Sequence, residues 1–274
     1  MTEFRVACVQ NTAGRDIEDN VKWVVSAIDE AAQGGASFIA LPETVGLIEP
    51  VNARIPAATY GEDADPGLAA LRERAQRHRV MILVGSQLIR EAGQIFNRSF
   101  LLDRDGEVCA RYDKLHMFDI ELANGEVYRE SDAITPGNRA VLADTALGRI
   151  GLSVCYDLRF SALYRALAHA GAEIITIPAA FTQTTGQAHW HVLVRARAIE
   201  TGCYVIAPNQ CGHHCDQRRS YGHSLIVDPW GKVLADGGTE PGLIFADVDM
   251  AQVSRARQRI PNLQNEREFR IECG

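Results

Sequence analysis

The sequence predicts an α/β fold in which buried strands alternate with amphipathic helices. Apolar runs of strand length, such as residues 4–10 and 38–41, flank a segment with the periodicity of a helix. Alternation of this kind is typical of a layered α/β fold rather than of a helical bundle or a β-sandwich. Residues 35–42 and 171–178 also resemble each other, because both run from a helix end through a buried strand to a proline. We therefore expect two similar halves stacked within a single domain that covers 1–274.

The first half begins with a predicted strand at 4–10, which is nearly all apolar, as strands covered on both faces tend to be. A helix follows, with Asp16 as its N-cap, one apolar face and the glycines 34–35 at its end. The strand at 38–41 comes next. A second helix starts at Pro66, because proline is favoured at the first helical position. Further strands are predicted at 81–87, 95–102 and 108–112, with a tight hairpin turn at 103–106.

The second half repeats this order of elements. We expect a strand at 150–155, a helix at 162–170, a strand at 174–177, a polar loop at 182–187, a helix at 189–200 and a strand at 204–208. The residues Asp-Pro-Trp-Gly at 228–231 signal a hairpin that joins strands 222–227 and 232–235. A last strand spans 243–248. Residues 255–274 are charged and contain Pro261, so we expect this tail to become ordered by packing on a partner subunit.

The composition excludes several classes of protein. A hydrophobic content of 46% is that of an ordinary globular protein. The formal net charge of -7, with scattered arginines, argues against binding to nucleic acid or to an anionic membrane surface. No signal peptide or membrane-spanning run is evident. The seven cysteines lack a framework spacing and fit a reducing cytoplasm, so the sequon at 97–99 is a chance match.

Three segments place a reactive side chain just past the C-terminal end of an apolar strand. Glu43 follows Leu41-Pro42, Lys114 follows the strand at 108–112, and Cys155 closes the strand at 150–155. Ligands of open α/β sheets bind at that edge. Taken alone, each residue is weak evidence, because a cysteine at such a position is more often a small buried hydrophobe than a nucleophile. Their combination within longer motifs is more informative.

Those motifs resemble the nitrilase superfamily of carbon–nitrogen hydrolases. The resemblance covers residues 4–261 and rests on "LPE" at Glu43, "YDKLHMFD" at Lys114, "YRES" at Glu130, "GLSVCYDLRF" at Cys155 and the later run "AHWHVLVRARAIETGCYVIAPNQCG". It implies a four-layer α-β-β-α sandwich of the nitrilase type, with two pseudo-symmetric halves, that assembles face to face as a homodimer. It also implies an amidase that needs no cofactor, with a catalytic triad of Glu43, Lys114 and Cys155 and with Glu130 as a fourth polar member.

Amide hydrolysis explains why these residue types are needed together. A free thiol is only a few per cent thiolate at neutral pH, so we expect Lys114 and the start of the following helix to lower its pKa. Cys155 would attack the carbonyl while Glu43 takes its proton, protonates the leaving amine and then activates water. Lys114 and the backbone N–H of Tyr156 would stabilise the oxyanion. Glu130 would keep Lys114 charged and in place, although a surface acid is the alternative reading of Glu130.

The substrate is predicted from resemblance and position. The segments "HWHVLVRARAIE" and "SYGHSLIVDPWG" are most similar to the branch of the superfamily that hydrolyses deaminated glutathione to 2-oxoglutarate and cysteinylglycine. An ω-amidase acting on 2-oxoglutaramate or 2-oxosuccinamate is the main alternative. Arg159 suits a substrate carboxylate, which a guanidinium binds with two hydrogen bonds, but an ion pair with Asp157 or Glu173 would also explain it. Position alone places four further residues in the pocket: Tyr156, Phe181, Thr182 and Thr185.

Two positions depart from the family pattern, and one alternative class of function stays open. Relatives usually carry a glutamate where this chain has His191, and an aromatic residue near 44–46. A binding protein that uses metal or thiol chemistry could instead employ Cys211, His213, His214 and Cys215. The spacing of these residues lacks the paired C-x₂-C arms of a structural zinc site, so a polar loop is favoured and no metal is predicted. His189 and His191 are expected to be packing and capping groups.

Overall fold

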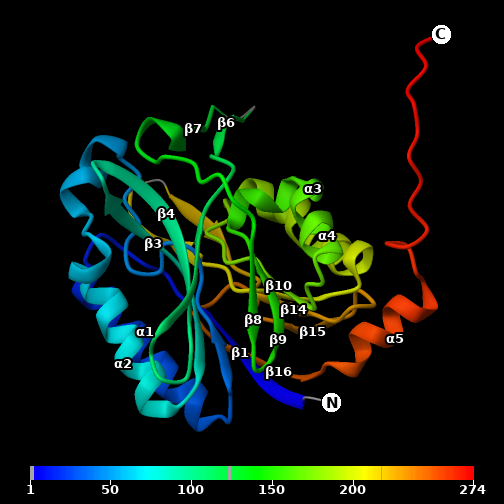
Figure 1. The fold of residues 1–274 in the computed structure, drawn as a ribbon. Helices are drawn as coiled ribbons and strands as arrows, with labels where there is room; N and C mark the ends of the chain where they lie inside the picture. Colours follow the sequence, from blue (N-terminus) through cyan, green and yellow to red (C-terminus); the bar gives the residue numbers. More distant parts are fainter. Residues whose placement is uncertain (1–2, 123–124, 217) are drawn as a thin grey trace.

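The computed structural model describes residues 3–122, 125–216 and 218–274, and its core consists of two six-stranded sheets. The sheets lie face to face, and each has helices on its outer side, so the predicted four-layer α-β-β-α sandwich is confirmed (Figure 1). The helices are α1 (Ile17–Gln33) and α2 (Pro66–His78) on one side, and α3 (Ser161–His169) and α4 (Gln183–Thr201) on the other. No helix in these ranges is both long and apolar enough to cross a bilayer.

The first sheet has the strand order β16-β1-β2-β3-β4-β5. Its strands are β16 (Gly242–Asp249), β1 (Glu3–Gln10), β2 (Phe38–Ala40), β3 (Met81–Glu91), β4 (Gln94–Leu102) and β5 (Val108–Asp113). The second sheet has the order β15-β14-β11-β10-β9-β8. Its strands are β15 (Val233–Asp236), β14 (Leu225–Val227), β11 (Tyr204–Ala207), β10 (Ile174–Thr176), β9 (Gly148–Leu152) and β8 (Val141–Thr145).

The two sheets have the same topology, as the internal resemblance predicts. In the first sheet an antiparallel edge strand, β16, precedes the parallel strands β1, β2 and β3, and the antiparallel strands β4 and β5 follow. In the second sheet β8 precedes the parallel strands β9, β10 and β11, and β14 and β15 follow in the same sense. Helices α1 and α2 connect the parallel strands of the first sheet, and α3 and α4 connect those of the second.

Alternation along the strands separates the inner layer of the core from the outer one. In β1, Val6 and Cys8 contact the cluster between the sheets, whereas Ala7 and Val9 contact the cluster beneath α1 and α2. Successive side chains of a strand point to opposite faces, so an apolar run such as β1 serves both layers at once. The N-cap of α1 is as predicted, because the Asp16 carboxylate accepts a hydrogen bond of 3.0 Å from the Asp19 N–H.

Several predicted boundaries are wrong. Helix α4 begins at Gln183, so most of the expected polar loop at 182–187 is helical. The first turn of this helix has the polar sequence of a loop. In the structure it packs closely against Tyr221: a Cβ atom added at Gly186 would lie only 2.4 Å from the Tyr221 Cβ. The strand expected at 150–155 ends at Leu152, and a short 3-10 helix, η4 (Cys155–Arg159), follows.

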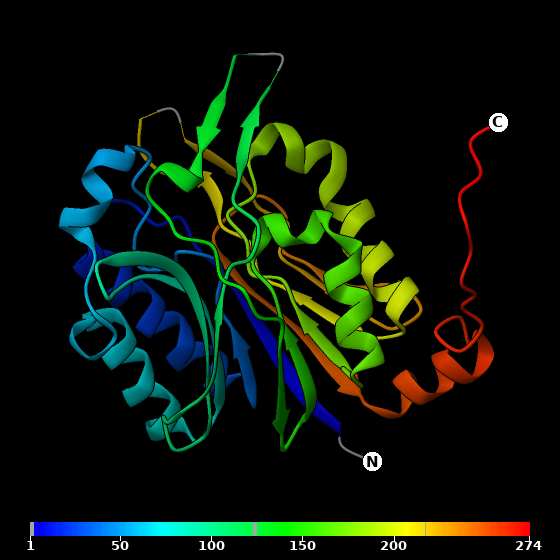
Figure 2. The ribbon, with the colours of Figure 1, turned by 45° about the horizontal axis from the view of Figure 1, so that its top comes forward.

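Elements that have little apolar pattern were not predicted from the sequence. They are β8, the two-stranded ribbons β6 (Asp119–Glu121) with β7 (Val127–Arg129) and β12 (Cys211–His213) with β13 (Arg219–Tyr221), the 3-10 helices η1 (Asn52–Ala58), η2 (Glu62–Ala64) and η3 (Glu130–Asp132), and helix α5 (Ala251–Arg259). The start of the expected tail, residues 255–259, belongs to helix α5, whose one buried residue is Val253. After α5 the chain runs away from the two sheets (Figure 2), with Phe269 and Ile271 more than four-fifths exposed.

Candidate active site

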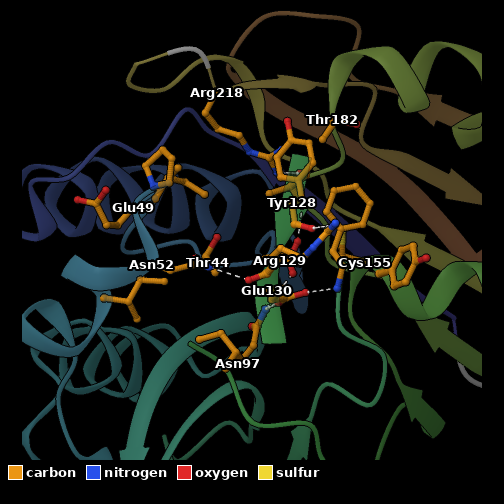
Figure 3. A pocket seen from close by; sticks show the side chains of 18 of the residues that line it. Thr44, Glu49, Asn52, Asn97, Tyr128, Arg129, Glu130, Cys155, Thr182 and Arg218 are labelled. Atoms are coloured by element: carbon orange, nitrogen blue, oxygen red, sulfur yellow. Dashed lines mark hydrogen bonds between the residues drawn. The ribbon is translucent and has the colours of Figure 1, made fainter. Parts of the chain in front are cut away.

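The loops after β2, β5 and β9 bring three chemically reactive side chains to one end of the two sheets. Glu43 lies three residues beyond β2, Lys114 directly follows β5, and Cys155 lies three residues beyond β9. The first sheet therefore contributes the carboxylate and the ammonium, and the second sheet contributes the thiol. All three residues line one cavity of about 830 Å³, together with Glu130 from η3 (Figure 3).

Lys114 is the centre of a buried cluster of charges. Its Nζ donates to Glu43 Oε1 at 2.9 Å and to both oxygens of Glu130, at 2.9 and 2.8 Å. The lysine side chain is 2% exposed and the Glu43 side chain 7%. An isolated charge would be strongly destabilising at this depth, whereas a charge with all its hydrogen bonds made is tolerated. The two carboxylates raise the pKa of Lys114 well above its usual range even though burial acts to lower it, so the ammonium stays charged.

Neighbouring donors hold the two carboxylates in place. Asn97 Nδ2 on β4 donates to Glu43 Oε1 at 2.9 Å and to Glu130 Oε1 at 3.3 Å. The backbone N–H of Ala180 donates to Glu43 Oε2 at 2.8 Å, and that of Phe118 donates to Glu130 Oε2 at 2.6 Å. In the sequence, Asn97 is only part of a chance sequon. The polar residues at 97–99 interrupt the apolar pattern of β4, which is the signal that could have identified it.

The Cys155 backbone is strained and fixed by the second sheet. Its φ of 46° lies in the left-handed region that side-chain-bearing residues rarely adopt. The Cys155 N–H donates to the Pro178 carbonyl at 2.8 Å, which anchors the turn to the loop after β10. Asp157 secures the other side of the turn by accepting from the Val154 N–H at 2.9 Å and from the Tyr112 hydroxyl at 2.6 Å. Strain of this kind persists where the surrounding contacts determine the conformation.

The resting protonation states differ from the sequence-based expectation. Burial raises the pKa of the Cys155 thiol well above its usual range, the negative charge of Glu43 adds to this, and Lys114 offsets it only in part. The sequence-based expectation that Lys114 lowers the pKa of Cys155 below its usual value is therefore wrong, because burial and Glu43 have the larger effect. Burial also acts to raise the pKa of Glu43, but the Lys114 charge and the hydrogen bonds from Cys155 and the Ala180 N–H lower it overall. The site thus holds a neutral thiol beside a carboxylate that can accept its proton.

The predicted substrate contacts divide into two groups. Four of them line the cavity: Tyr156, Phe181, Thr182 and Thr185. Arg159 is not among the lining residues, and its guanidinium lies over the Phe181 ring at 5.2 Å and beside His189 Nδ1 at 3.3 Å. The alternative ion pairs of Arg159 with Asp157 or Glu173 are absent from the described part of the chain. Two arginines that the sequence analysis did not select, Arg129 and Arg218, do line the cavity.

The four residues of the alternative metal or thiol site do not gather at one point in the described ranges. His213 Nε2 contacts the Asp216 carbonyl at 2.7 Å, and His214 Nδ1 contacts the Ala13 carbonyl at 2.8 Å. Cys211 bonds to Thr12, and Cys215 to the Ile48 carbonyl. Each of these side chains thus has its own partner.

The four-layer sandwich with a cysteine, a glutamate and a lysine at its shared strand ends defines an enzyme that hydrolyses carbon–nitrogen bonds. The chain belongs to the carbon-nitrogen hydrolase family, whose family model matches residues 5–258. It is 42% identical over 273 residues to the deaminated glutathione amidase of Homo sapiens, covering 96% of this chain and 82% of the relative. It is 38% identical to the enzyme of the same name from Synechocystis, covering 97% of this chain and 98% of the relative.

Solved structures show the same fold. The Caenorhabditis elegans NitFhit protein superposes with a TM-score of 0.89 at 34% identity, and the match covers 97% of this chain and 65% of that protein. A mutant of the amidase from Nesterenkonia sp. AN1 superposes with a TM-score of 0.81 at 27% identity, covering 96% of this chain and 94% of that one. The Nesterenkonia structure has the acetamide moiety of fluoroacetamide added covalently to its active-site cysteine.

The electrostatics of the cluster predict how Cys155 titrates in a Glu43→Gln variant. Removing the Glu43 charge takes away a group that raises the thiol pKa and leaves Lys114, which lowers it. We expect the pH midpoint for alkylation of Cys155 by iodoacetamide to shift downward, measured by peptide mass spectrometry to separate Cys155 from the exposed Cys109 and Cys273. An unchanged or higher midpoint would contradict this account of the thiol. Asp63→Asn, an exposed acid outside the cluster, is the control and should leave the midpoint unchanged.

Proposed function

We propose that this chain hydrolyses deaminated glutathione at its amide bond and releases 2-oxoglutarate and cysteinylglycine. The observation that carries the proposal is the Lys114 ammonium held between Glu43 and Glu130 in the same cavity as Cys155. The relatives named as deaminated glutathione amidases align over nearly the whole chain. A cavity of about 830 Å³ also suits a substrate of tripeptide size, since small-molecule sites usually enclose about 300–1,000 Å³.

In the proposed reaction Cys155 is the nucleophile and Glu43 transfers the protons. The Cys155 Sγ bonds to the carbonyl carbon while its proton passes to Glu43, because the neutral resting thiol has to lose its proton as it attacks. Glu43 gives this proton to the amide nitrogen, the carbon–nitrogen bond breaks and the amine leaves. Water then attacks the thioester and loses a proton to Glu43. The acid departs, and the proton returns to the Cys155 sulfur.

Charge that develops on the carbonyl oxygen needs donors that are already in place. The Lys114 ammonium is the first candidate, and the backbone N–H of Tyr156 is the second, because it belongs to the opening turn of η4 and lacks an intrahelical acceptor. A donor of this kind typically lowers the barrier by about 3 kcal/mol. Glu130 acts as a positioning residue, since it accepts two of the three hydrogen bonds of Lys114.

The carboxylates of the substrate require cationic partners in or beside the cavity. Deaminated glutathione carries a carboxylate at each end, so two partners are needed. Arg159 is one proposed partner, because its guanidinium lies against the rings of Phe181 and Tyr156, which line the cavity. Arg218 is the second proposed partner. Its guanidinium lies over the Tyr128 ring at 5.3 Å and donates to the Ala180 carbonyl. No acidic side chain among the described residues lies within 4.0 Å of it, so its charge is available to a substrate carboxylate.

An ω-amidase acting on 2-oxoglutaramate or 2-oxosuccinamate is the second candidate. Those substrates share the 2-oxo acid end of deaminated glutathione but lack the dipeptide. The catalytic cluster would serve them equally well, so the volume of the cavity, about 830 Å³, is what favours the larger substrate. Assembly as a homodimer, packing of the tail beyond α5 on the partner, and a cytoplasmic location stay predictions from the sequence.

The choice of substrate is tested by following 2-oxoglutarate release from deaminated glutathione and from 2-oxoglutaramate. We expect a kcat/KM preference for the first substrate of at least about tenfold, because its dipeptide part can make additional contacts in the cavity. A tenfold preference corresponds to about 1.4 kcal/mol. Cys155→Ala should abolish both activities without changing the circular dichroism spectrum. Equal kcat/KM values would favour the ω-amidase, and an active Cys155→Ala variant would refute the cysteine mechanism.

The proposed roles of Arg159 and Arg218 are distinguished by how each substitution changes KM for a long and for a short substrate. Arg218→Ala should raise KM for deaminated glutathione by about tenfold or more and leave 2-oxoglutaramate nearly unaffected, because the shorter substrate does not reach the second carboxylate position. Arg159→Ala should raise KM for both. Arg104→Ala, in the exposed turn between β4 and β5, is the matched control. Equal effects of Arg218→Ala on both substrates would argue against its proposed role.

A further inference from the structure

Two histidines and an aspartate converge in the second half of the fold, outside the residues that line the catalytic cavity. His191 lies on α4, His223 precedes β14, and Asp236 ends β15. His191 Nε2 is 3.0 Å from Asp236 Oδ2, and His223 Nδ1 is 2.8 Å from Asp236 Oδ1. The three potential ligand atoms all lie within 4.8 Å of one another. Segments separated by up to 45 residues thus bring three donors to a single point.

The backbone around this cluster is fixed by several hydrogen bonds. His223 has a φ of 54°, an unfavourable value for a residue with a side chain, and its N–H donates to the Gly238 carbonyl at 2.6 Å. Its carbonyl accepts from Trp190 Nε1 at 2.7 Å. The Gly238 N–H in turn donates to Asp236 Oδ1 at 2.9 Å. An unusual backbone conformation held by its surroundings is a reason to look for a function.

The side chains are also held in position by packing. The Tyr221 ring stacks on the His223 ring with centroids 4.6 Å apart, and it meets the His191 ring edge-on at 6.0 Å. The two imidazoles are 5.0 Å apart and steeply inclined, so their nitrogens approach the carboxylate from different directions. Between about a quarter and a third of each of the three side chains is exposed. An ion could therefore enter from solvent and keep a water ligand.

We propose that His191, His223 and Asp236 bind a divalent transition metal, with Zn²⁺ as the best match. Two imidazole nitrogens and one carboxylate oxygen are a ligand set that zinc accepts, with the fourth position left to water. Magnesium and calcium prefer all-oxygen sites, so they fit less well. This assignment differs from the sequence-based expectation that His191 is a packing or capping group and that no metal binds.

A bound ion would link α4 to β15 and thereby fix one wall of the catalytic cavity. His191 follows Trp190, whose ring packs at 5.1 Å from Phe181, and Phe181 lines the cavity. The first turn of α4 contributes Thr185 to the same lining. Without metal, the Asp236 carboxylate would hold the two imidazoles by hydrogen bonds alone. The metal-bound and metal-free forms therefore differ in ligation and in the rigidity of α4.

The proposal is tested by titrating the full-length protein with Zn²⁺ and with Co²⁺. A Cys155→Ala background prevents the catalytic thiol from binding the ion. We expect one equivalent of Zn²⁺ by calorimetry and a higher Tm when it is bound, since binding to the folded state alone stabilises that state. Co²⁺ should give visible d–d absorption without the near-ultraviolet charge-transfer band of a cobalt thiolate, because none of the three ligands is a cysteine.

Three variants distinguish this site from chance binding elsewhere. His191→Gln and Asp236→Asn should each weaken Zn²⁺ binding by at least about tenfold. His189→Gln, on the same helix and outside the cluster, should leave the affinity unchanged. Circular dichroism and the metal-free Tm verify that each variant is folded. Unchanged affinity in both ligand variants, a cobalt thiolate band or the absence of stoichiometric binding would overturn the proposal, whatever substrate the enzyme hydrolyses.

Discussion

The buried Lys114 ammonium is the constraint on which the rest of the site depends. A cation at this depth is stable only if its partners are ionised and oriented, and Glu43 and Glu130 meet that need only because other groups hold them. The Ala180 N–H, from the loop after β10, reaches across to Glu43, and Gln210, from the loop after β11, donates to the Glu43 carbonyl at 2.9 Å. Groups of the second sheet therefore hold both the carboxylate and the backbone of Glu43, which belongs to the first sheet.

This interdependence gives the pseudo-symmetric halves different chemical roles. Glu43 follows Leu41-Pro42 after β2, and the corresponding position after β10 is Ala179, following Ile177-Pro178. The two sheets thus have equivalent positions after their proline, but only the first half has an acidic residue at that position. The second half supplies the strained turn at Cys155 and the Ala180 N–H, which donates to the second oxygen of Glu43. The buried cluster around Lys114 consequently forms once, between two layers that share one architecture.

The sequence predicts the parts of this arrangement that depend on local pattern. The strands of the two large sheets other than β8, the Asp16 cap and the placement of Glu43, Lys114 and Cys155 at strand ends follow from apolar periodicity and topology. The start of α4 could not be predicted, because its first turn is polar in sequence and packs against the distant Tyr221. The role of Asn97 and the direction of the Cys155 pKa depend on burial and on distances between remote segments. No local pattern encodes these.

The neutral resting state of Cys155 also bears on how this thiol would react with oxidants. Peroxides react with thiolates, so a thiol whose proton is retained by burial and by a neighbouring carboxylate is a poor target for conversion to sulfenic acid. As the proposed nucleophile, Cys155 would become reactive only as an amide binds and Glu43 accepts the proton. Coupling nucleophilicity to substrate in this way lets a cysteine hydrolase persist where a permanently ionised thiolate would be consumed.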